Sequence, residues 1–208
     1  MESVAPAEPV SLLESTFASS AMARLLAHFA VRPDDEVHVR ELQRLTGLGM
    51  GSLQAELKRL VALGILSRRS RANRVAYRLE TGHPRWEPLR RLIGLTATPL
   101  ELLRAAFAGV KGVDAAFVFG SEARGDSGPE SDVDLFILGR EDVHHAVGRA
   151  LTEVELLTGR EIDVMEYTPD RATRRIGRGS VFLDRVADEP RQWIAGDPQA
   201  LERLRRAA

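Results

Sequence analysis

Two aspartates, Asp132 and Asp134, stand one residue apart at the start of an apolar run, and a Gly120-Ser121 pair ends the apolar run before it. Alternate side chains of a strand point to the same face, so we expect both carboxylates on one face and Val133 on the other. Two carboxylates this close repel each other unless a cation binds both. Mg²⁺ in proteins is bound by one or two carboxylates together with substrate phosphates. The pattern therefore predicts that Asp132 and Asp134 hold magnesium beside a nucleoside triphosphate.

The Gly120-Ser121 turn has the residue types of a phosphate-binding turn. Glycine allows close backbone approach, and the start of the short helix expected after it presents free N–H groups to an anion. The Ser121 hydroxyl adds a hydrogen bond and Arg124 adds a positive charge. We therefore predict that Gly120, Ser121 and Arg124 bind the nucleotide. Glu122, in the same helix start, is expected to point to solvent.

A third acid is expected from a neighbouring strand, and "REIDVMEY" supplies Asp163. Ile162 and Val164 beside it point to the other face. Asp163 would hold a second metal ion or take the proton of an attacking hydroxyl. Glu161 has the same parity and is a weaker candidate. The predicted catalytic set is thus Asp132, Asp134 and Asp163, which are also the predicted ligands of two Mg²⁺ ions.

The stretch that carries these residues resembles the minimal nucleotidyltransferase domains of the DNA polymerase β-like superfamily. In those domains Gly-Ser is followed after ten residues by Asp-x-Asp, and here residues 122–131 separate the two motifs without a gap. The "ARG" at 123–125 and the "SD" at 131–132 also match, and the likeness covers roughly 110–167. The resemblance implies triphosphate binding by Gly120 and Ser121, metal binding by Asp132 and Asp134, and completion of the triad by Asp163.

The elements that must position these residues follow an α/β order. Two helices are expected at 85–95 and 99–109, then strands in "VDAAFVF", "SDVDLFILG" and "REIDVMEY", with an amphipathic helix before the last strand. Short helices and a strand are expected after Thr168. We predict a nucleotidyltransferase domain over 84–208 with a small mixed sheet.

The N-terminal part has a different order of elements. A helix is expected over 12–30, a short strand and a helix up to Gly47, a helix over 50–64 capped by Ser52, and a hairpin over 65–79. This order resembles the DNA-binding half of small bacterial and archaeal winged-helix regulators. We predict a winged helix-turn-helix domain over 12–82, with three helices and a β-hairpin, so that the fold class of the whole chain is α+β.

The charge of this part favours DNA. Residues 50–79 contain seven basic residues and one acid, although the net charge of the chain is only −1. In a winged helix the first residues of the recognition helix reach base edges and the wing lies against phosphates. The predicted DNA contacts are Ser52, Gln54 and Lys58 on the helix and Arg68, Arg69, Arg71 and Arg74 on the hairpin. The alternative is that the module docks a protein or dimerises, and Gly49 and Gly51 indicate weak base-specific readout.

Together these features predict a DNA-binding transcription regulator that transfers a nucleoside monophosphate, with ATP as the expected donor, to a hydroxyl. The resemblance implies a protein acceptor, as in antitoxins that adenylylate a partner toxin, or a small molecule such as an aminoglycoside. A further alternative is a regulator that only senses nucleotide. We expect a homodimer, because paired half-sites compensate for a small interface. The chain has no cysteine and no apolar run of roughly 20 residues, so we expect a cytoplasmic protein without membrane contact.

Overall fold

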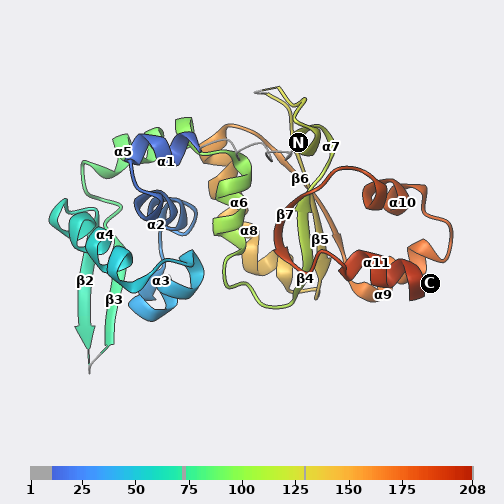
Figure 1. Cartoon of the computed structure of the whole chain (residues 1–208), viewed down its shortest axis with the longest axis horizontal. Coiled ribbons are helices and arrows are strands. Elements are labelled where there is room, and N and C mark those ends of the chain that lie inside the picture. The colour runs from blue at the N-terminus through green and yellow to red at the C-terminus, as the bar shows by residue number, and fades with distance from the viewer. Residues whose placement is uncertain (1–10, 72–73, 129, 208) are drawn as a thin grey trace, which may run out of the picture.

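The computed structural model describes residues 11–71, 74–128 and 130–207 (Figure 1). The elements of its N-terminal part are α1 (Leu12–Phe17), α2 (Ser20–Val31), β1 (Glu36–His38), α3 (Val39–Thr46), α4 (Met50–Ala62), β2 (Leu66–Arg71) and β3 (Arg74–Leu79). The strand β3 lies between β1 and β2, and both pairings are antiparallel. The hairpin of β2 and β3 is the one that the sequence predicts.

The C-terminal part holds a second sheet and most of the helices. Its elements are α5 (Trp86–Thr96), α6 (Pro99–Phe107), β4 (Val113–Val118), α7 (Gly120–Arg124), β5 (Val133–Gly139), α8 (Val143–Thr158), β6 (Ile162–Tyr167), α9 (Pro169–Ile176), α10 (Val181–Asp188), β7 (Gln192–Gly196) and α11 (Ala200–Ala207). The strand order is β6-β5-β4-β7, with β5 and β6 parallel and the other pairs antiparallel. The α+β class and the small mixed sheet are therefore confirmed.

The helix predicted over 12–30 is two helices in the structure. α1 ends at Ala18, whose φ of 50° lies in the left-handed region, and α2 begins after Ser19. The Ser19 hydroxyl accepts a hydrogen bond from the Met22 N–H, which is the contact of a helix N-cap. The apolar spacing continues unchanged through this break, so periodicity alone could not reveal it.

The start of α4 also differs from the prediction. Gly49 is its N-cap, in an extended conformation and without a side-chain hydrogen bond. Ser52, predicted as the cap, is the third residue of the helix, where its backbone is already helical. That prediction is wrong, because a cap residue must lie outside the helical conformation. Gly47 does end α3, with a left-handed φ of 67°, as expected.

One face of the four-stranded sheet shares a hydrophobic core with the N-terminal helices. Val133, Leu135 and Ile137 of β5 belong to the same buried cluster as Leu103 of α6 and Phe29 of α2. The helix α2 packs on α6 and α8, which cover this face of the sheet (Figure 1). Since each fully buried side chain of this size stabilises the fold by about 1.5–3 kcal/mol, the N-terminal helices and the sheet stabilise one another.

The opposite face of the sheet is covered by α9, α10 and α11 (Figure 1). Phe117 of β4 and Phe136 of β5 stack there with ring centroids 4.9 Å apart. Because side chains alternate along β5, Asp134 points to this second face and not to the core beneath α2. No helix in the described part of the chain is both long and apolar enough to span a bilayer.

A histidine is buried within the helix α2. His28 of α2 is buried, its ring meets Phe29 edge-on, and neither ring nitrogen has a hydrogen-bond partner among the described residues. Burial, and to a smaller degree the charge of Arg32, lower the pKa of His28 to about 4. The imidazole is therefore neutral in the folded protein at neutral pH.

We expect the free energy of unfolding to fall as the pH is lowered from about 6.5 towards about 4, because the unfolded chain then binds a proton at His28 that the folded chain excludes. In His28→Leu the loss over this range should be smaller by about 1–3 kcal/mol. Urea unfolding at a series of pH values measures it. His145→Leu, a change at an exposed position of α8, is the control, and equal pH dependence in all three proteins would contradict the expectation.

Candidate functional site

The Gly120-Ser121 turn lies directly against the carboxylate of Asp134. Gly120 has a φ of 68°, and a Cβ added there would overlap the Asp134 Oδ2 atom. The Phe119 N–H donates a hydrogen bond of 3.1 Å to the Asp134 carbonyl, which continues the β4–β5 pairing up to the turn. Position 120 therefore favours glycine for its backbone conformation, and a side chain there would displace the Asp134 carboxylate.

The two strands β5 and β6 bring the predicted acids together. Asp134 and Asp163 are direct partners in the parallel register of these strands, and Asp132 immediately precedes β5. Burial raises the pKa of Asp134, and the charges of Asp163 and then Asp132 raise it further. The structure thus places all three acids within electrostatic reach of one another, beside the turn.

These acids offer only oxygen atoms, which suits a hard cation such as Mg²⁺. Among the residues that the structure describes, no three His, Cys, Asp or Glu side chains are arranged so that they could hold a metal ion by themselves. Mg²⁺ would therefore be held by fewer than three of these side chains. Burial and the neighbouring charges of Asp163 and Asp132 both disfavour the ionised form of Asp134. The charge of a dication would favour that ionised form.

Arg124, the last residue of α7, is exposed and lies close to the same acids. Its charge lowers the pKa of Asp134, against the larger effects that raise it. Its Nε is 3.2 Å from the Asp126 carboxylate and its guanidinium is 3.9 Å from the Glu189 carboxylate. Arg124 thus stands near the turn as predicted, with two acidic neighbours that the sequence did not reveal.

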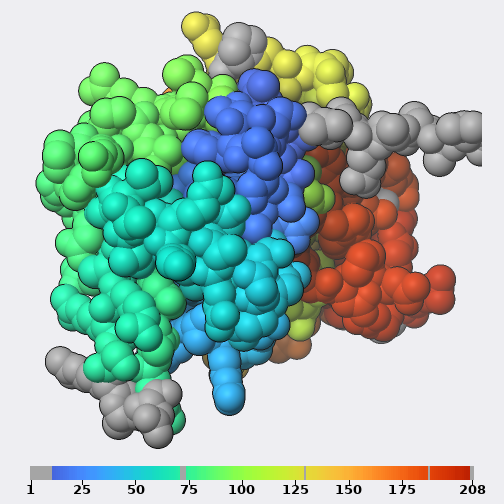
Figure 2. Space-filling view, turned by 60° about the vertical axis from the view of Figure 1, so that its left-hand side comes forward, coloured from blue at the N-terminus to red at the C-terminus, as the bar shows by residue number. Residues whose placement is uncertain are grey.

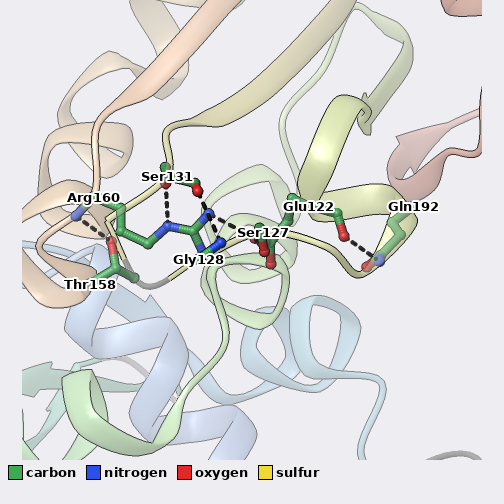
Figure 3. Close-up of polar contacts among 7 residues, drawn as sticks. All are labelled: Glu122, Ser127, Gly128, Ser131, Thr158, Arg160 and Gln192. Carbon is green, nitrogen blue, oxygen red and sulfur yellow. Dashed lines mark hydrogen bonds and ion pairs between the residues drawn. The ribbon is translucent and has the colours of Figure 1, made fainter.

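Glu122 does not point to solvent, as the sequence suggested. Its carboxylate forms an ion pair of 2.7 Å with Arg160, and both side chains are largely buried (Figure 3). The Ser127 hydroxyl donates to the same carboxylate, and the Gln192 side chain donates to the Glu122 carbonyl. The sequence places the acid Glu122 beside the turn predicted to bind phosphate, where a neutralising partner would be required, and this was the only signal for Arg160.

A hollow opens at the edge of the sheet where β5 and β6 begin. Its volume is about 710 Å³, and Asp132 and Asp163 lie in its wall together with residues of the C-terminal end of α8. Glu155 and Glu161 also line it, so its charge is predominantly negative. A substrate group in this hollow would lie next to two of the three predicted catalytic acids.

The candidate DNA-contacting residues lie on α4 and on the hairpin, which face the same side of the molecule (Figure 2). Ser52, Gln54 and Lys58 are exposed on α4. On the hairpin, Arg68, Arg69 and Arg74 are exposed, and the side chain of Arg71, the last residue of β2, lies outside the described residues.

Arg69 is already engaged within the protein. Its guanidinium is 3.2 Å from the Glu36 carboxylate of β1, on the other side of β3. Because neighbouring side chains of a strand point to opposite faces, Arg68 and Arg69 lie on different faces of the hairpin. Each face of the hairpin therefore presents fewer arginines than the sequence suggested.

Comparison with known proteins supports the class of the C-terminal part. A family model described as a nucleotidyltransferase domain matches residues 101–181, which run from α6 to the start of α10 and include the turn and all three acids. Residues 101–181 are thus similar to a nucleotidyltransferase domain, and this similarity supports, at the coarse level, the class of a transferase. No curated protein matches the sequence.

Among solved structures, the chain is similar to one named "Crystal structure of the toxin-antitoxin with AMP-PNP". The two share 11% sequence identity, the similarity covers 47% of this chain and 73% of that chain, and the TM-score is 0.30. A likeness of this extent supports no argument about this protein.

Replacing Asp134 by asparagine should stabilise the fold at neutral pH, because it removes a partly desolvated charge that Asp163 and Asp132 repel. We expect the melting temperature at pH 7 to rise by about 2 °C. The pKa of Asp134 is raised in the folded state, so wild-type stability is lost as the pH rises through that pKa. The gain should therefore vanish in acid, where Asp134 is itself protonated.

Thermal unfolding at pH 7 and in acid measures this difference. Asp114→Asn, at an exposed position at the opposite end of β4, is the control and should change neither melting temperature. A destabilised Asp134→Asn at pH 7 would show that the carboxylate stabilises the fold, contrary to this expectation.

Proposed function

We propose that the protein is a Mg²⁺-dependent nucleotidyltransferase, which transfers the nucleoside monophosphate of an NTP, with ATP as the expected donor, to a hydroxyl group. The observation that supports it most is the contact between the left-handed Gly120 and the Asp134 carboxylate, opposite Asp163. In this arrangement the turn that we propose to bind phosphate lies beside the partly desolvated Asp134 carboxylate and the exposed Asp163. The match of residues 101–181 to a nucleotidyltransferase domain agrees with it.

In this proposal the turn holds the triphosphate and the acids hold the metal. The backbone at Gly120 and the hydroxyl of Ser121 bind phosphate oxygens, and Arg124 adds positive charge. Asp132 and Asp134 would supply carboxylate oxygens to Mg²⁺, and Asp163 would be the further ligand for a second ion. Bound Mg²⁺ would neutralise the charge that develops on the triphosphate during transfer.

In the alternative role of Asp163, its carboxylate takes the proton of the acceptor hydroxyl; this side chain is exposed at the hollow beside β6. The acceptor oxygen forms a bond to the α-phosphorus, the bond from that phosphorus to the bridging oxygen breaks, and pyrophosphate leaves. The protein contributes by holding the reacting groups in line and by placing a base within reach of the hydroxyl.

Two acceptor classes follow from the sequence resemblance: a hydroxyl of a partner protein, as in an antitoxin that modifies its toxin, and a small molecule. The acidic wall of the hollow, with Glu155 and Glu161, favours a cationic small molecule of the aminoglycoside type as the second candidate. A regulator that binds nucleotide without turnover would bind ATP but release no pyrophosphate.

We also propose that residues 12–82 form a winged helix that binds DNA, which would make the protein a regulator of transcription, and that residues 84–208 form the nucleotidyltransferase unit. The order of α2, α3, α4 and the hairpin is what a winged helix requires, and the exposed Ser52, Gln54 and Lys58 lie on the helix that would enter the major groove. A homodimer would present two such helices to paired half-sites.

Changing Asp132 and Asp134 together to alanine should abolish Mg²⁺-dependent ATP binding, because both carboxylates proposed to hold the metal are removed. Calorimetric titration with ATP in the presence of Mg²⁺ measures binding, and α-labelled ATP measures transfer and pyrophosphate release. Asp114→Ala is the control with an exposed acid removed from the same sheet. Unchanged binding in the double variant would refute the proposed site.

Changing Arg68, Arg69 and Arg71 to alanine should weaken binding to duplex DNA of any sequence. The slope of log K against log salt should become shallower by about 0.9 for each phosphate that the variant no longer neutralises. Because Arg69 is paired with Glu36, we expect Arg69→Ala alone to have a smaller effect than Arg68→Ala. Binding of a random-sequence duplex at several salt concentrations measures both.

Arg91→Ala, which removes an exposed arginine of α5, serves as the control for charge alone. A salt dependence that is the same in the triple variant and the wild type would argue against DNA contact by the hairpin.

A further inference from the structure

Arg160 connects three segments of the proposed site. It lies between the end of α8 and the start of β6, and its side chain is only 10% exposed. Its guanidinium forms the 2.7 Å ion pair with Glu122 of α7, and its Nε donates a hydrogen bond of 2.6 Å to the carbonyl of Ser131 (Figure 3). Ser131 is the residue immediately before Asp132, so Arg160 reaches the backbone next to a proposed metal ligand.

The loop between α7 and β5 is held by the same group of residues. The Ser127 hydroxyl donates to the Glu122 carboxylate at 2.7 Å, and the Ser131 hydroxyl accepts from the Gly128 N–H at 2.9 Å (Figure 3). We call Glu122, Ser127, Ser131 and Arg160 the Arg160 cluster. This loop carries Asp132 at its end. Its described residues, 125–128 and 130–132, lie in no helix or strand, so their conformation depends on such side-chain contacts.

The ion pair also has an electrostatic role. Glu122 follows Ser121 in the turn proposed to bind the triphosphate, and an unpaired carboxylate at this position would repel that anion. With both side chains largely buried, the interaction between the two charges is only weakly screened by water. Arg160 therefore cancels a negative charge where the proposed function requires phosphate to bind.

We propose that Arg160 is a positioning residue of the nucleotidyl transfer: through the Arg160 cluster it holds the 125–132 loop so that Asp132 stays beside Asp134, and it neutralises Glu122 next to the phosphate turn. The effect of Arg160 on catalysis rests on the proposed function. Its effect on the conformation of the loop can be measured without any ligand. Arg160 itself touches neither the reacting atoms nor the metal in this proposal.

The first test measures hydrogen exchange of the full chain without nucleotide. In Arg160→Met, the amides of Gly128 and Ser131 should exchange at least about tenfold faster, while those of β4 and β5 keep their wild-type rates. The control is Arg90→Met, which breaks the ion pair of 3.0 Å between Arg90 of α5 and Glu153 of α8, a partly buried pair that involves no residue of the loop. Arg90→Met should leave the exchange of the loop unchanged.

The second test measures the affinity for ATP in the presence of Mg²⁺ by calorimetry. Arg160→Met should bind about tenfold more weakly than the wild type, and adding Glu122→Gln should restore part of the loss, because the unpaired charge is then gone. Arg90→Met should bind as the wild type does. A loss of stability alone predicts equal effects of the two arginine changes and no gain in affinity from Glu122→Gln.

Loop amides that keep wild-type exchange in Arg160→Met would overturn the inference, and so would Mg²⁺·ATP affinity equal to that of the wild type. The two proposals fail differently. The wild type could bind no Mg²⁺·ATP while Arg160→Met still speeds amide exchange in the loop. In that case the proposed function is wrong, and the inference that Arg160 holds the loop is upheld.

Discussion

The parallel pairing of β5 with β6 is the constraint on which the rest of the site depends. It sets Asp134 directly opposite Asp163, in a register that places two carboxylates side by side at the edge of the sheet. Burial raises the pKa of Asp134 and the charge of Asp163 raises it further, so such a pair is unfavourable in a folded chain without a cation. The left-handed turn at Gly120 adds to this by packing its backbone against the same carboxylate. The domain therefore keeps locally unfavourable electrostatics at a position where the charge of a dication would offset the repulsion between the carboxylates.

The two hydrophobic clusters explain how the fold tolerates such a site. One cluster joins α2, α6 and α8 to one face of the sheet, and the other joins α9, α10 and α11 to the opposite face. Both faces are thus stabilised by apolar burial, while Asp132 and Asp163 stay exposed and Asp134 is only partly buried. The first cluster also ties the N-terminal helices to the sheet, so that α2 packs on α6 and α8 while α4 and the hairpin keep their polar faces exposed.

Much of the site could be predicted because its residues are close in sequence or alternate on strands. The spacing from Gly120-Ser121 to Asp132 and Asp134 identified the turn and two acids, and the parity of Asp163 placed it on the matching face. The role of Glu122 could not be predicted, because its partner Arg160 lies 38 positions away and only the β5–β6 pairing brings them together. Glu189, the acidic neighbour of Arg124, could not be predicted either, because it is also far from Arg124 in the sequence.

Local boundaries show where periodicity stops being informative. The break at Ala18 and the N-cap at Gly49 depend on single backbone conformations, which apolar spacing does not report. The sequence by itself determined the order of the elements, the turn, the acids and the side of each strand that they occupy, because these follow from glycine conformation and from the period of side chains. Only the tertiary structure decided which distant charges meet, namely Arg160 with Glu122 and Arg69 with Glu36, because long-range pairing of strands and helices sets those distances.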